Sequence, residues 1–295
     1  MVAVTAAPST ADTAFEEHRP LLFGVAYRML GTLGDAEDAV QESYLRYCAA
    51  EGEIANPRAY LVTVVTRICL DVLKSARVQR EQYIGPWLPE PLIRRAGEAP
   101  SPEEHAATAD SVSYAFLVML EELGPVERAV FLLREVFDYD YADIAPIVMK
   151  SEAACRQVFH RARQRLAERQ HRHTADYNLR RDLTIRFLAA ANEGNMAGLL
   201  EILSADVVAY SDGGGKAAAA INPVAGADHV ARFAMGIARK NPPASIELVD
   251  INGSPGVILR RKSGRADTVM LLEVADGRVT RLYSMRNPEK LVRAS

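Results

Sequence analysis

The chain has 295 residues, 49% of them hydrophobic and 25% charged, and a formal net charge of −3. Its length fits two or three domains, and its composition excludes a disordered chain, which would combine fewer apolar residues with a larger net charge. No apolar run is long enough to span a bilayer, and the N-terminus lacks the basic and apolar segments of a signal peptide.

Cysteine usage indicates a reducing compartment. Cys48, Cys69 and Cys155 are scattered, with no CxxC pair and no metal-ligand spacing. We therefore expect a cytoplasmic protein that holds neither a metal ion nor a cofactor.

The first part of the chain is predicted to be helical. Residues 1–14 are expected to form a disordered tail, and residues 15–82 a helical domain. Phe15 to Leu30 carries apolar residues at helical spacing, and Gly31 ends that helix.

Two more helices are predicted in this domain. Asp35 is expected to cap the first of them, with Asp38 three residues later as the partner acid of a capping-box-like start. A loop at 52–57 follows. Pro57 then opens a long helix that runs to about Glu81, because proline is tolerated in the first turn.

Residues 83–102 are predicted to form a linker. They contain five prolines and two glycines, which forbid regular structure. Helices resume near Glu103 and continue to about Gln170, which places a second helical domain at 103–175.

After Asp176 the pattern changes to an α+β domain, residues 176–295, with an antiparallel sheet. Three helices are predicted, at Leu179–Asn192, Met196–Ser204 and Ala227–Lys240. Four strand-like runs follow, at 246–251, 257–261, 268–274 and 279–285. Hairpin-turn signals separate these runs at Asn252-Gly253, Ser263-Gly264 and Asp276-Gly277.

Residues 141–166 carry the pattern of a helix-turn-helix. The first helix has an apolar face made of Tyr141, Ile144, Ala145 and Val148. Ser151 is predicted to cap the second helix, whose buried face recurs at helical spacing and consists of Cys155, Phe159, Ala162 and Leu166. Pro146 removes an N–H group inside the first helix, so we expect a kink or a late start there.

The opposite face of the second helix is suited to DNA. Residues 150–172 carry seven basic side chains against two acidic ones, and local charge decides contact with a polyanion. Arg156 can bond guanine through two hydrogen bonds, and Gln157 can pair with adenine. The candidate contacts are Ser151, Glu152, Arg156, Gln157, His160, Arg161, Arg163 and Arg165. The alternative is a solvated helix of a bundle, which the tight turn, the cap and the basic charge disfavour.

Several segments resemble the sigma factors of bacterial RNA polymerase. Residues 19–47 resemble their first conserved region, in which DAEDAVQESY (35–44) looks like the helix that binds the coiled coil of the polymerase β′ clamp. Residues 56–81 resemble the helix that recognises and opens the −10 promoter element, and 122–166 resemble the domain that reads the −35 element. The two helical domains, with no third between them, are typical of the extracytoplasmic-function (ECF) class.

Four short motifs narrow the resemblance to ECF sigma factors fused to a SnoaL-like domain. They are KSEAACRQVFHRAR (150–163), WLPEP (87–91), DGGGK (212–216) and NPEKL (287–291). The resemblance implies a transcription initiation factor, not an enzyme, with sigma region 2 at 15–82 and sigma region 4 at 103–175. It also implies a cone-shaped α+β domain, like that of SnoaL-like polyketide cyclases and ketosteroid isomerase. This domain would regulate activity in cis, without a separate anti-sigma factor.

Roles for residues of the helical domains also come from the resemblance. RNA polymerase core would bind through its β′ clamp and β flap, with the clamp contacting Asp35, Glu37, Asp38, Gln41 and Glu42. Promoter DNA at the −10 element would contact Asn56, Arg58, Tyr60, Thr63, Arg67, Lys74 and Arg77. Asn56 is the candidate for holding a flipped base, because its loop resembles the base-capturing loop of the family.

The glycine loop of the α+β domain has three interpretations. It can approach a partner closely because glycines adopt positive φ angles, it can form a small-ligand or catalytic site around Asp212 and Tyr210, or it can be a plain surface loop. We favour the partner contact, since an apolar ring such as Trp87 in a linker usually buries against a surface. This regulatory contact would comprise Trp87, Leu88, Pro89, Asp212, Gly213, Gly214, Gly215, Lys216, Asn287 and Pro288.

Two other functions stay open on the residues alone. One is a transcriptional regulator that binds DNA without polymerase, and it has no need of the 19–81 segment. The other is a cyclase or isomerase fused to a DNA-binding part, which requires a polar pocket with a strongly perturbed carboxylate. A promoter-opening assay with core polymerase separates the three functions.

Overall fold

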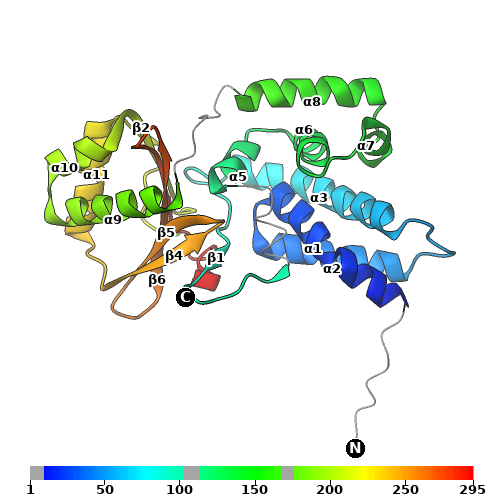
Figure 1. Ribbon diagram of the computed structural model, residues 1–295, viewed down its shortest axis with the longest axis horizontal. Helices are drawn as coiled ribbons and strands as arrows, with labels where there is room; N and C mark the ends of the chain where they lie inside the picture. Colours follow the sequence, from blue (N-terminus) through cyan, green and yellow to red (C-terminus); the bar gives the residue numbers. More distant parts are fainter. Residues whose placement is uncertain (1–9, 103–112, 168–175, 295) are drawn as a thin grey trace, which may run out of the picture. The chain divides into compact units, whose positions relative to one another are not determined.

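The computed structural model describes residues 10–102, 113–167 and 176–294 (Figure 1). These residues form two compact units. The first, a helical unit, holds residues 10–77, 100–102 and 119–167, and the second, an α+β unit, holds residues 78–99, 113–118 and 176–294. Residues 83–99 of the linker therefore belong structurally to the α+β unit, although they lie between the two helical domains in the sequence.

The first half of the helical unit consists of α1 (Thr10–Leu30), α2 (Leu33–Cys48) and α3 (Pro57–Glu81). The expectation that residues 1–14 form a tail is wrong for residues 10–14, which extend α1 by more than a turn. The predicted cap at Asp35 is also misplaced. Thr32 is the N-cap residue, and its hydroxyl donates to Asp35 Oδ2 at 2.5 Å. Asp35 is therefore the third residue of the first turn, where its negative charge interacts favourably with the positive end of the helix dipole.

The second half of this unit contains α6 (Pro125–Phe131) with its π-helical continuation η2 (Leu132–Val136), α7 (Tyr141–Val148) and α8 (Glu152–Ala167). They are preceded by α5 (Tyr114–Leu120), whose residues 114–118 belong to the α+β unit. The late start considered for α7 is wrong, since the helix begins at Tyr141. Pro146 lies in its last turn, three residues before Met149 ends the helix with φ of +53°. Pro146 lacks the N–H group that would bond to the Ala142 carbonyl, and the helix continues for only two residues beyond it.

The α+β unit is built on one seven-stranded sheet with the order β1-β4-β5-β6-β7-β2-β3. Its strands are β1 (Ile93–Arg94), β2 (Leu203–Asp212), β3 (Val224–Ala225), β4 (Ser245–Ile251), β5 (Ser254–Arg260), β6 (Ala266–Ala275) and β7 (Arg278–Met285). The expectation of a purely antiparallel sheet is wrong, because β2 pairs in parallel with β7. Three further strands were not predicted: β2, which follows a helix directly, the two-residue β3, and β1, which lies in the proline-rich linker.

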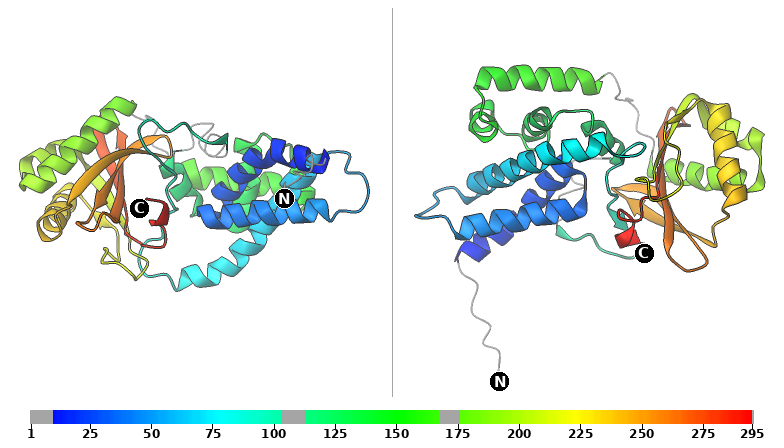
Figure 2. Two further views of the ribbon diagram at one scale, coloured as in Figure 1. Left: turned by 90° about the horizontal axis from the view of Figure 1, so that it is seen from below. Right: turned by 180° about the vertical axis from the view of Figure 1, so that it is seen from behind.

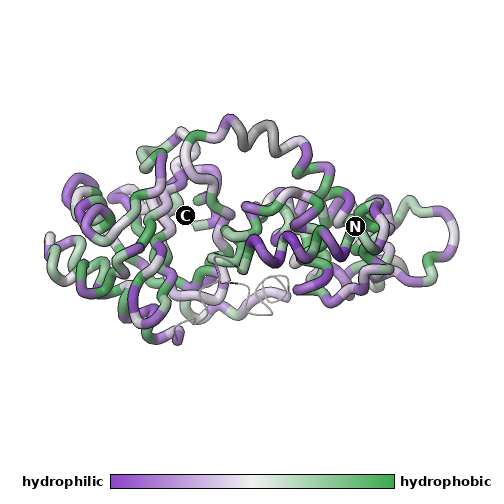
Figure 3. Tube along the Cα trace, turned by 90° about the horizontal axis from the view of Figure 1, so that it is seen from above, coloured by the Kyte–Doolittle hydropathy of each residue, from purple (hydrophilic) through white to green (hydrophobic). Residues whose placement is uncertain are grey.

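Helices cover one face of this sheet (Figures 1 and 2). They are α9 (Tyr177–Glu193), α10 (Met196–Ile202) and α11 (Ala227–Lys240). Side chains alternate between the faces of each strand, so Met270 and Leu282 pack with Phe187 and Val230 on the helix side. The hydropathy colours of Figure 3 accordingly change between hydrophobic and hydrophilic over short distances along the chain.

The other face of the sheet packs against the linker and the start of α5. Leu88, Tyr114, Leu271 and Tyr283 belong to a buried cluster on that face. Linker residue Leu92 exchanges two hydrogen bonds with Asn252, at 2.9 and 3.0 Å. The prediction that residues 83–102 lack regular structure is therefore wrong in part, because Ile93 and Arg94, which lie between Pro91 and Pro100, add an edge strand to the sheet.

The predicted hairpin turns are confirmed. Asn252 and Gly253 both have positive φ angles, +50° and +75°, and so do Asp276 and Gly277, at +51° and +74°. A two-residue hairpin of this kind matches the twist of the strands. Gly264, in the third predicted turn, has φ of +82°.

Candidate functional site

The predicted recognition helix α8 presents its basic face to solvent. The Ser151 hydroxyl oxygen accepts from the Ala154 amide at 3.2 Å, which confirms the predicted cap. Cys155, Ala162 and Leu166 are buried, as predicted, whereas Phe159 is only partly buried and Val158 is buried beside it. The opposite face is exposed, including Ser151, Glu152, Arg156, Gln157, His160, Arg161, Arg163 and Arg165.

Two of these arginines are engaged within the helical unit. Arg156 pairs with Glu152 at 3.3 Å and lies over the Tyr141 ring, with 5.5 Å to its centroid. Both contacts are at the surface, so DNA can replace them. Arg165 is held more firmly, because its Nη1 donates to Glu127 Oε2 at 3.0 Å and to the Glu122 carbonyl at 3.3 Å. Arg165 therefore fastens α8 to the start of α6, and we no longer expect it to be a main phosphate contact.

The loop and first turns of α3 carry the predicted −10 contacts. Asn56 caps the helix through its side-chain oxygen, which accepts from the Ala59 amide at 3.0 Å. That oxygen is engaged in this structure, although the residue is exposed. Tyr60 packs against Tyr47 with ring centroids 6.0 Å apart, and the Thr63 hydroxyl donates to the Ala59 carbonyl at 2.8 Å.

Arg67 of α3 is bonded to the second half of the helical unit. Its Nη2 donates to the Pro146 carbonyl at 2.8 Å and its Nε to the Ile147 carbonyl at 3.3 Å. Arg58 lies over the Tyr139 ring, 5.7 Å from its centroid. These two predicted DNA contacts are thus held by the segment that contains α7.

The remaining −10 candidates differ from Arg67. Lys74 is exposed and pairs with Asp71 at 2.8 Å. The side chain of Arg77 lies outside the described residues.

The acidic strip of α2 lies on its exposed face. Leu33, Ala36, Ala39, Val40 and Ser43 form the buried face of the helix. Asp35, Glu37, Asp38 and Gln41 are exposed, and Glu42, which is partly buried, accepts from Arg46 Nε at 2.8 Å. The helix therefore presents these carboxylates to solvent.

The α+β unit contains a buried polar centre at Asp212. Asp212 is the last residue of β2 and is fully buried. Its Oδ2 accepts from the Leu88 amide at 2.9 Å and from Lys290 Nζ at 2.7 Å, and its Oδ1 accepts from the Tyr83 hydroxyl at 2.5 Å. A carboxylate with three donors is fully satisfied without water.

Lys290 joins the linker to the C-terminal segment. Besides Asp212, its ammonium group donates to the Leu88 carbonyl at 2.5 Å and lies 4.0 Å from the centroid of the Trp87 ring. The interpretation of Trp87 and Leu88 as contact residues thus agrees with the geometry. Sequence reasoning missed Tyr83 and Lys290, although Lys290 is part of the NPEKL motif.

The glycine loop fits closely around this centre. Gly214 has φ of +58°, and a Cβ atom there would overlap the Asn287 side chain and approach the Tyr83 hydroxyl to 2.9 Å. The Asn287 amide donates to that hydroxyl at 2.9 Å. Lys216 forms an exposed pair with Glu289, and the Pro89 carbonyl accepts from the Tyr114 hydroxyl at 2.7 Å. Pro288 contributes its carbonyl, which accepts from the Leu291 amide at 3.3 Å.

Burial and the neighbouring carboxylate change the pKa of the Tyr83 hydroxyl. Burial first, and the hydrogen bond to Asp212 second, raise the pKa of Tyr83 above its ordinary value. The hydroxyl therefore stays a proton donor to Asp212 at physiological pH.

The Asp212 centre does not open into a cavity that a substrate could enter. Asp212 does not line the apolar cavity of about 100 Å³ between the sheet and its helices, which is bordered by Phe187, Phe233 and Met270. Among the residues that the structure describes, no group of three histidine, cysteine or acidic side chains could hold a metal ion. Within the same residues, no helix is long and apolar enough to cross a membrane.

Comparisons with known proteins give the family. A model of Sigma-70 region 2 matches residues 14–78, and a model of Sigma-70, region 4 matches residues 113–166. The chain is 36% identical over 286 residues to the ECF RNA polymerase sigma factor SigJ of Mycobacterium tuberculosis, which covers 94% of this chain and 91% of that protein. It is 33% identical over 288 residues to the probable ECF RNA polymerase sigma factor SigI of the same species, covering 95% and 94%.

A solved structure supports the same family assignment. The crystal structure of Mycobacterium tuberculosis SigJ matches with a TM-score of 0.77 at 35% identity, covering 94% of this chain and 97% of that one. Both alternatives, a regulator that acts without polymerase and a fused enzyme, are thereby set aside. The chain belongs to the ECF class of RNA polymerase sigma factors, transcription initiation factors that bind polymerase core and direct it to promoter DNA.

Proposed function

We propose that three helices divide the contacts of this sigma factor. The exposed carboxylates of α2 suit a basic coiled coil such as the β′ clamp, where complementary charge sets register and association rate. The −10 element is assigned to α3 and its preceding loop. The −35 element is assigned to α8. In the same proposal, the helix-turn-helix segment also contacts the β flap of the polymerase.

The same proposal makes the C-terminal α+β domain a regulator in cis, in place of a separate anti-sigma factor. The observation that carries this proposal is the bonding of the Asp212 carboxylate to the linker, at the Leu88 amide and the Tyr83 hydroxyl. Both contacts are made to the linker and neither to a ligand-binding cavity. The domain therefore acts on the segment that separates the two DNA-reading domains in the sequence.

Holding the linker limits its reach. An extended chain spans at most about 3.3–3.6 Å per residue, and a linker segment laid on the sheet as a strand cannot extend freely. Tyr83, Leu88 and Ile93 are each bonded to the sheet or to the Asp212 centre. Release of this segment would lengthen the free chain between the two domains, whose separation must match the spacing of the −10 and −35 elements.

The test is transcription from a defined promoter by core polymerase with full-length variants. Asp212→Asn combined with Lys290→Met removes the buried pair without leaving one charge behind. We expect altered output from unchanged start sites, with core polymerase bound as tightly as by the parent. The matched control is Arg232→Met with Asp228→Asn, which removes an exposed pair of α11 and should leave output unchanged.

Two results would contradict the proposal. Equal output from both double variants and the parent would remove the Asp212 centre from regulation. A 1–180 fragment should still bind core and select the same start sites, so complete loss of core binding by that fragment would mean that the α+β domain is more than a regulator.

A further inference from the structure

An apolar cavity of the α+β unit lies on the helix side of the sheet, opposite the face that packs against the linker. It has a volume of about 100 Å³ and is bordered mainly by α9, α11 and strands β2, β5, β6 and β7. Apolar side chains form most of its wall, among them Phe187 and Phe233 from the two helices and Met270 from the sheet. Ala218 and Ala219, which follow the glycine loop, also line it. A space with such a wall favours an apolar molecule over water.

Two serine hydroxyl groups lie together on the sheet side of this cavity. Ser211 of β2 and Ser284 of β7 both line it, and the parallel register places the two residues opposite one another. Within the part of the chain that the structure describes, neither hydroxyl bonds to another side chain or to the backbone. Ser211 is only 2% exposed, so bulk water does not supply the missing partner. Because buried hydroxyl groups normally have hydrogen-bond partners, this pair requires a polar group that enters the cavity.

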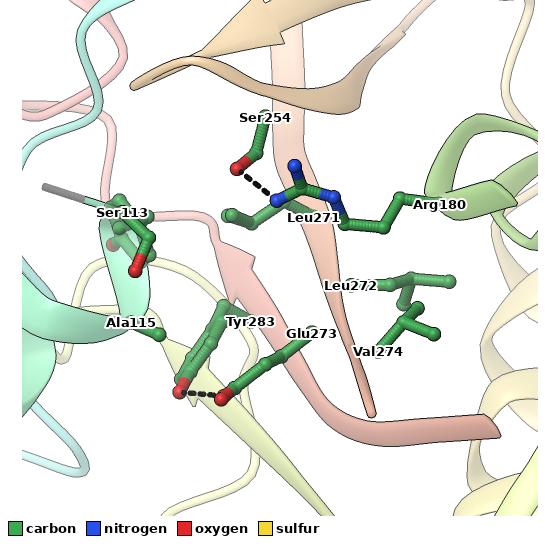
Figure 4. Close-up of a pocket in the computed structure, with 10 residues that line it drawn as sticks. Ser113, Ala115, Arg180, Ser254, Leu271, Leu272, Glu273, Val274 and Tyr283 are labelled. Atoms are coloured by element: carbon green, nitrogen blue, oxygen red, sulfur yellow. Dashed lines mark hydrogen bonds between the residues drawn. The ribbon is translucent and has the colours of Figure 1, made fainter. Parts of the chain in front are cut away.

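A smaller cavity of the same unit, of about 50 Å³, has the opposite arrangement (Figure 4). Its polar side chains bond to one another. Arg180 Nη1 donates to Ser254 Oγ at 2.9 Å, and the Tyr283 hydroxyl donates to Glu273 Oε2 at 3.1 Å. These polar groups are satisfied within the protein, so that cavity has no need of a ligand, in contrast to the one that contains the two serines.

The charge beside the two serines is balanced. Of the residues that the structure describes, Arg286 is the only ionisable one that lines the cavity. Its Nη2 donates to Asp267 Oδ2 at 3.0 Å, and its Nη1 donates to the Ala218 carbonyl. The Thr268 hydroxyl, which also lines the cavity, donates to Asp267 Oδ2 at 3.2 Å. A charged ligand would therefore lose its hydration without meeting a free counterion, whereas an uncharged ligand avoids that cost.

We infer that this cavity binds an uncharged compound with one aromatic ring and one hydroxyl group, the phenol class. A buried water needs about 10–15 Å³ of such space, so 100 Å³ accommodates roughly seven to nine heavy atoms, the size of phenol or a cresol. The rings of Phe187 and Phe233 and the sulfur atom of Met270 make favourable contacts with an aromatic ring. The ligand hydroxyl donates to one serine oxygen and accepts from the other serine hydroxyl, so both partners are satisfied.

The site is distinct from the proposed regulation through Asp212 and does not depend on it. Ser211 and Asp212 are neighbours on β2, and successive side chains of a strand point to opposite faces of the sheet. Asp212 bonds to the linker, at the Leu88 amide, while Ser211 faces the cavity. A phenolic compound is the chemical class of effector that this α+β domain would sense.

Saturation-transfer NMR titrations of the full chain test the inference with phenol, toluene and benzoate as probes. Phenol should bind in a saturable way. Toluene has the same shape without the hydroxyl group, so its affinity measures the apolar contribution alone. Benzoate carries a charge and should bind more weakly than phenol, because the cavity offers it no free counterion.

Ser211→Ala combined with Ser284→Ala should weaken phenol binding by about fivefold or more, the size of effect that lost neutral hydrogen bonds produce, and should not weaken toluene binding. The matched control is Ser204→Ala with Thr280→Ala, on the same two strands but outside the cavity, which should bind both compounds like the parent. Ala234→Leu places a larger side chain in the wall of the cavity and should weaken the binding of both compounds.

Absence of saturable phenol binding by the parent would overturn the site. Benzoate binding tighter than phenol binding would overturn the assignment to uncharged ligands. If Ala234→Leu does not fold, the ratio of phenol to toluene affinity in the two double variants decides instead: a ratio that falls only when Ser211 and Ser284 are replaced supports the site, and a ratio that is the same in both double variants overturns it.

Discussion

The Lys290 ammonium group lies 2.7 Å from Asp212 Oδ2, with side chains that are 9% and 0% exposed. Such a pair adds little net stability, because the loss of hydration offsets most of the attraction. We expect its effect to be on specificity, because both charges are satisfied only when Leu88 and Tyr83 also bond to them. The pair should therefore favour one register of the linker on the α+β domain.

Removing one partner of this pair should destabilise the α+β unit. Lys290→Met leaves the Asp212 carboxylate buried without its counterion, and the expected loss is about 3–5 kcal/mol in the free energy of unfolding. Asp212→Asn with Lys290→Met should recover part of that loss. Urea unfolding of the full chain measures both, with Lys216→Met at the exposed pair as the control, for which about 1 kcal/mol or less is expected. A loss below that of the control would show that the Lys290 charge is hydrated.

Gly214→Ala should loosen the linker, because its Cβ atom would meet Asn287 and the Tyr83 hydroxyl. Gly253→Ala is the matched control: it also has a positive φ, +75°, but its Cβ atom would meet nothing within 4 Å. Both variants share the backbone strain, which is about 1–2 kcal/mol, and only Gly214→Ala adds the clash. Trp87, the single tryptophan, should become more accessible to quenchers in Gly214→Ala alone. Identical quenching in both variants would contradict this.

Arg156 and Arg163 should differ in what they read. Arg156→Ala should relax base preference in the −35 element, at a cost of about 1–3 kcal/mol for the preferred base. Arg163→Ala should weaken binding to all sequences alike and lower the salt dependence by about one counterion. Arg165→Ala should instead destabilise the helical unit, because Arg165 holds Glu127 and the Glu122 carbonyl. Titrations on sequence variants at several salt concentrations distinguish these results, and equal losses for all bases with Arg156→Ala would exclude base reading.

Arg67 should contribute to the stability of the free protein as well as to DNA binding. Arg67→Ala removes two hydrogen bonds to the carbonyls of Pro146 and Ile147, so we expect about 1–2 kcal/mol less stability of the helical unit. Lys74→Ala, at an exposed pair on the same helix, should change stability little. With core polymerase present, both variants should bind −10 DNA more weakly. Unchanged stability of Arg67→Ala would mean that its contact with α7 contributes nothing in solution.

Acid should weaken the α+β unit partly through Asp267. Burial alone would raise the pKa of Asp267, but the guanidinium groups of Arg261 and Arg286 outweigh it and hold that pKa below the ordinary value. A depressed folded-state pKa gives stability that is present above the unfolded value, near 4, and is lost as pH falls through the folded value. Urea midpoints measured downward from pH 5 should therefore fall more steeply in the parent than in Asp267→Asn. Asp276→Asn, in an exposed turn, should keep the slope of the parent.

Local patterns by themselves determined most of the helices. Repeats of apolar residues three and four apart predicted the bounds of α3 and α11 and the buried face of α8, because each depends on residues within one or two turns. The hairpins at Asn252 and Asp276 were predictable for the same reason, since a two-residue turn encodes its own geometry. The resemblance to ECF sigma factors rested on such segments in order along the chain.

Tertiary structure alone decided which distant residues meet. The parallel pairing of β2 with β7 and the addition of β1 to the sheet edge join segments far apart in the chain, and no local pattern encodes such partners. Arg67 and Arg165 have the sequence signature of DNA contacts, yet each is bonded to another part of the helical unit. Lys290 likewise is an ordinary lysine until folding places it between Asp212 and Trp87. A side chain's role follows from the groups that surround it, and packing between distant segments sets those groups.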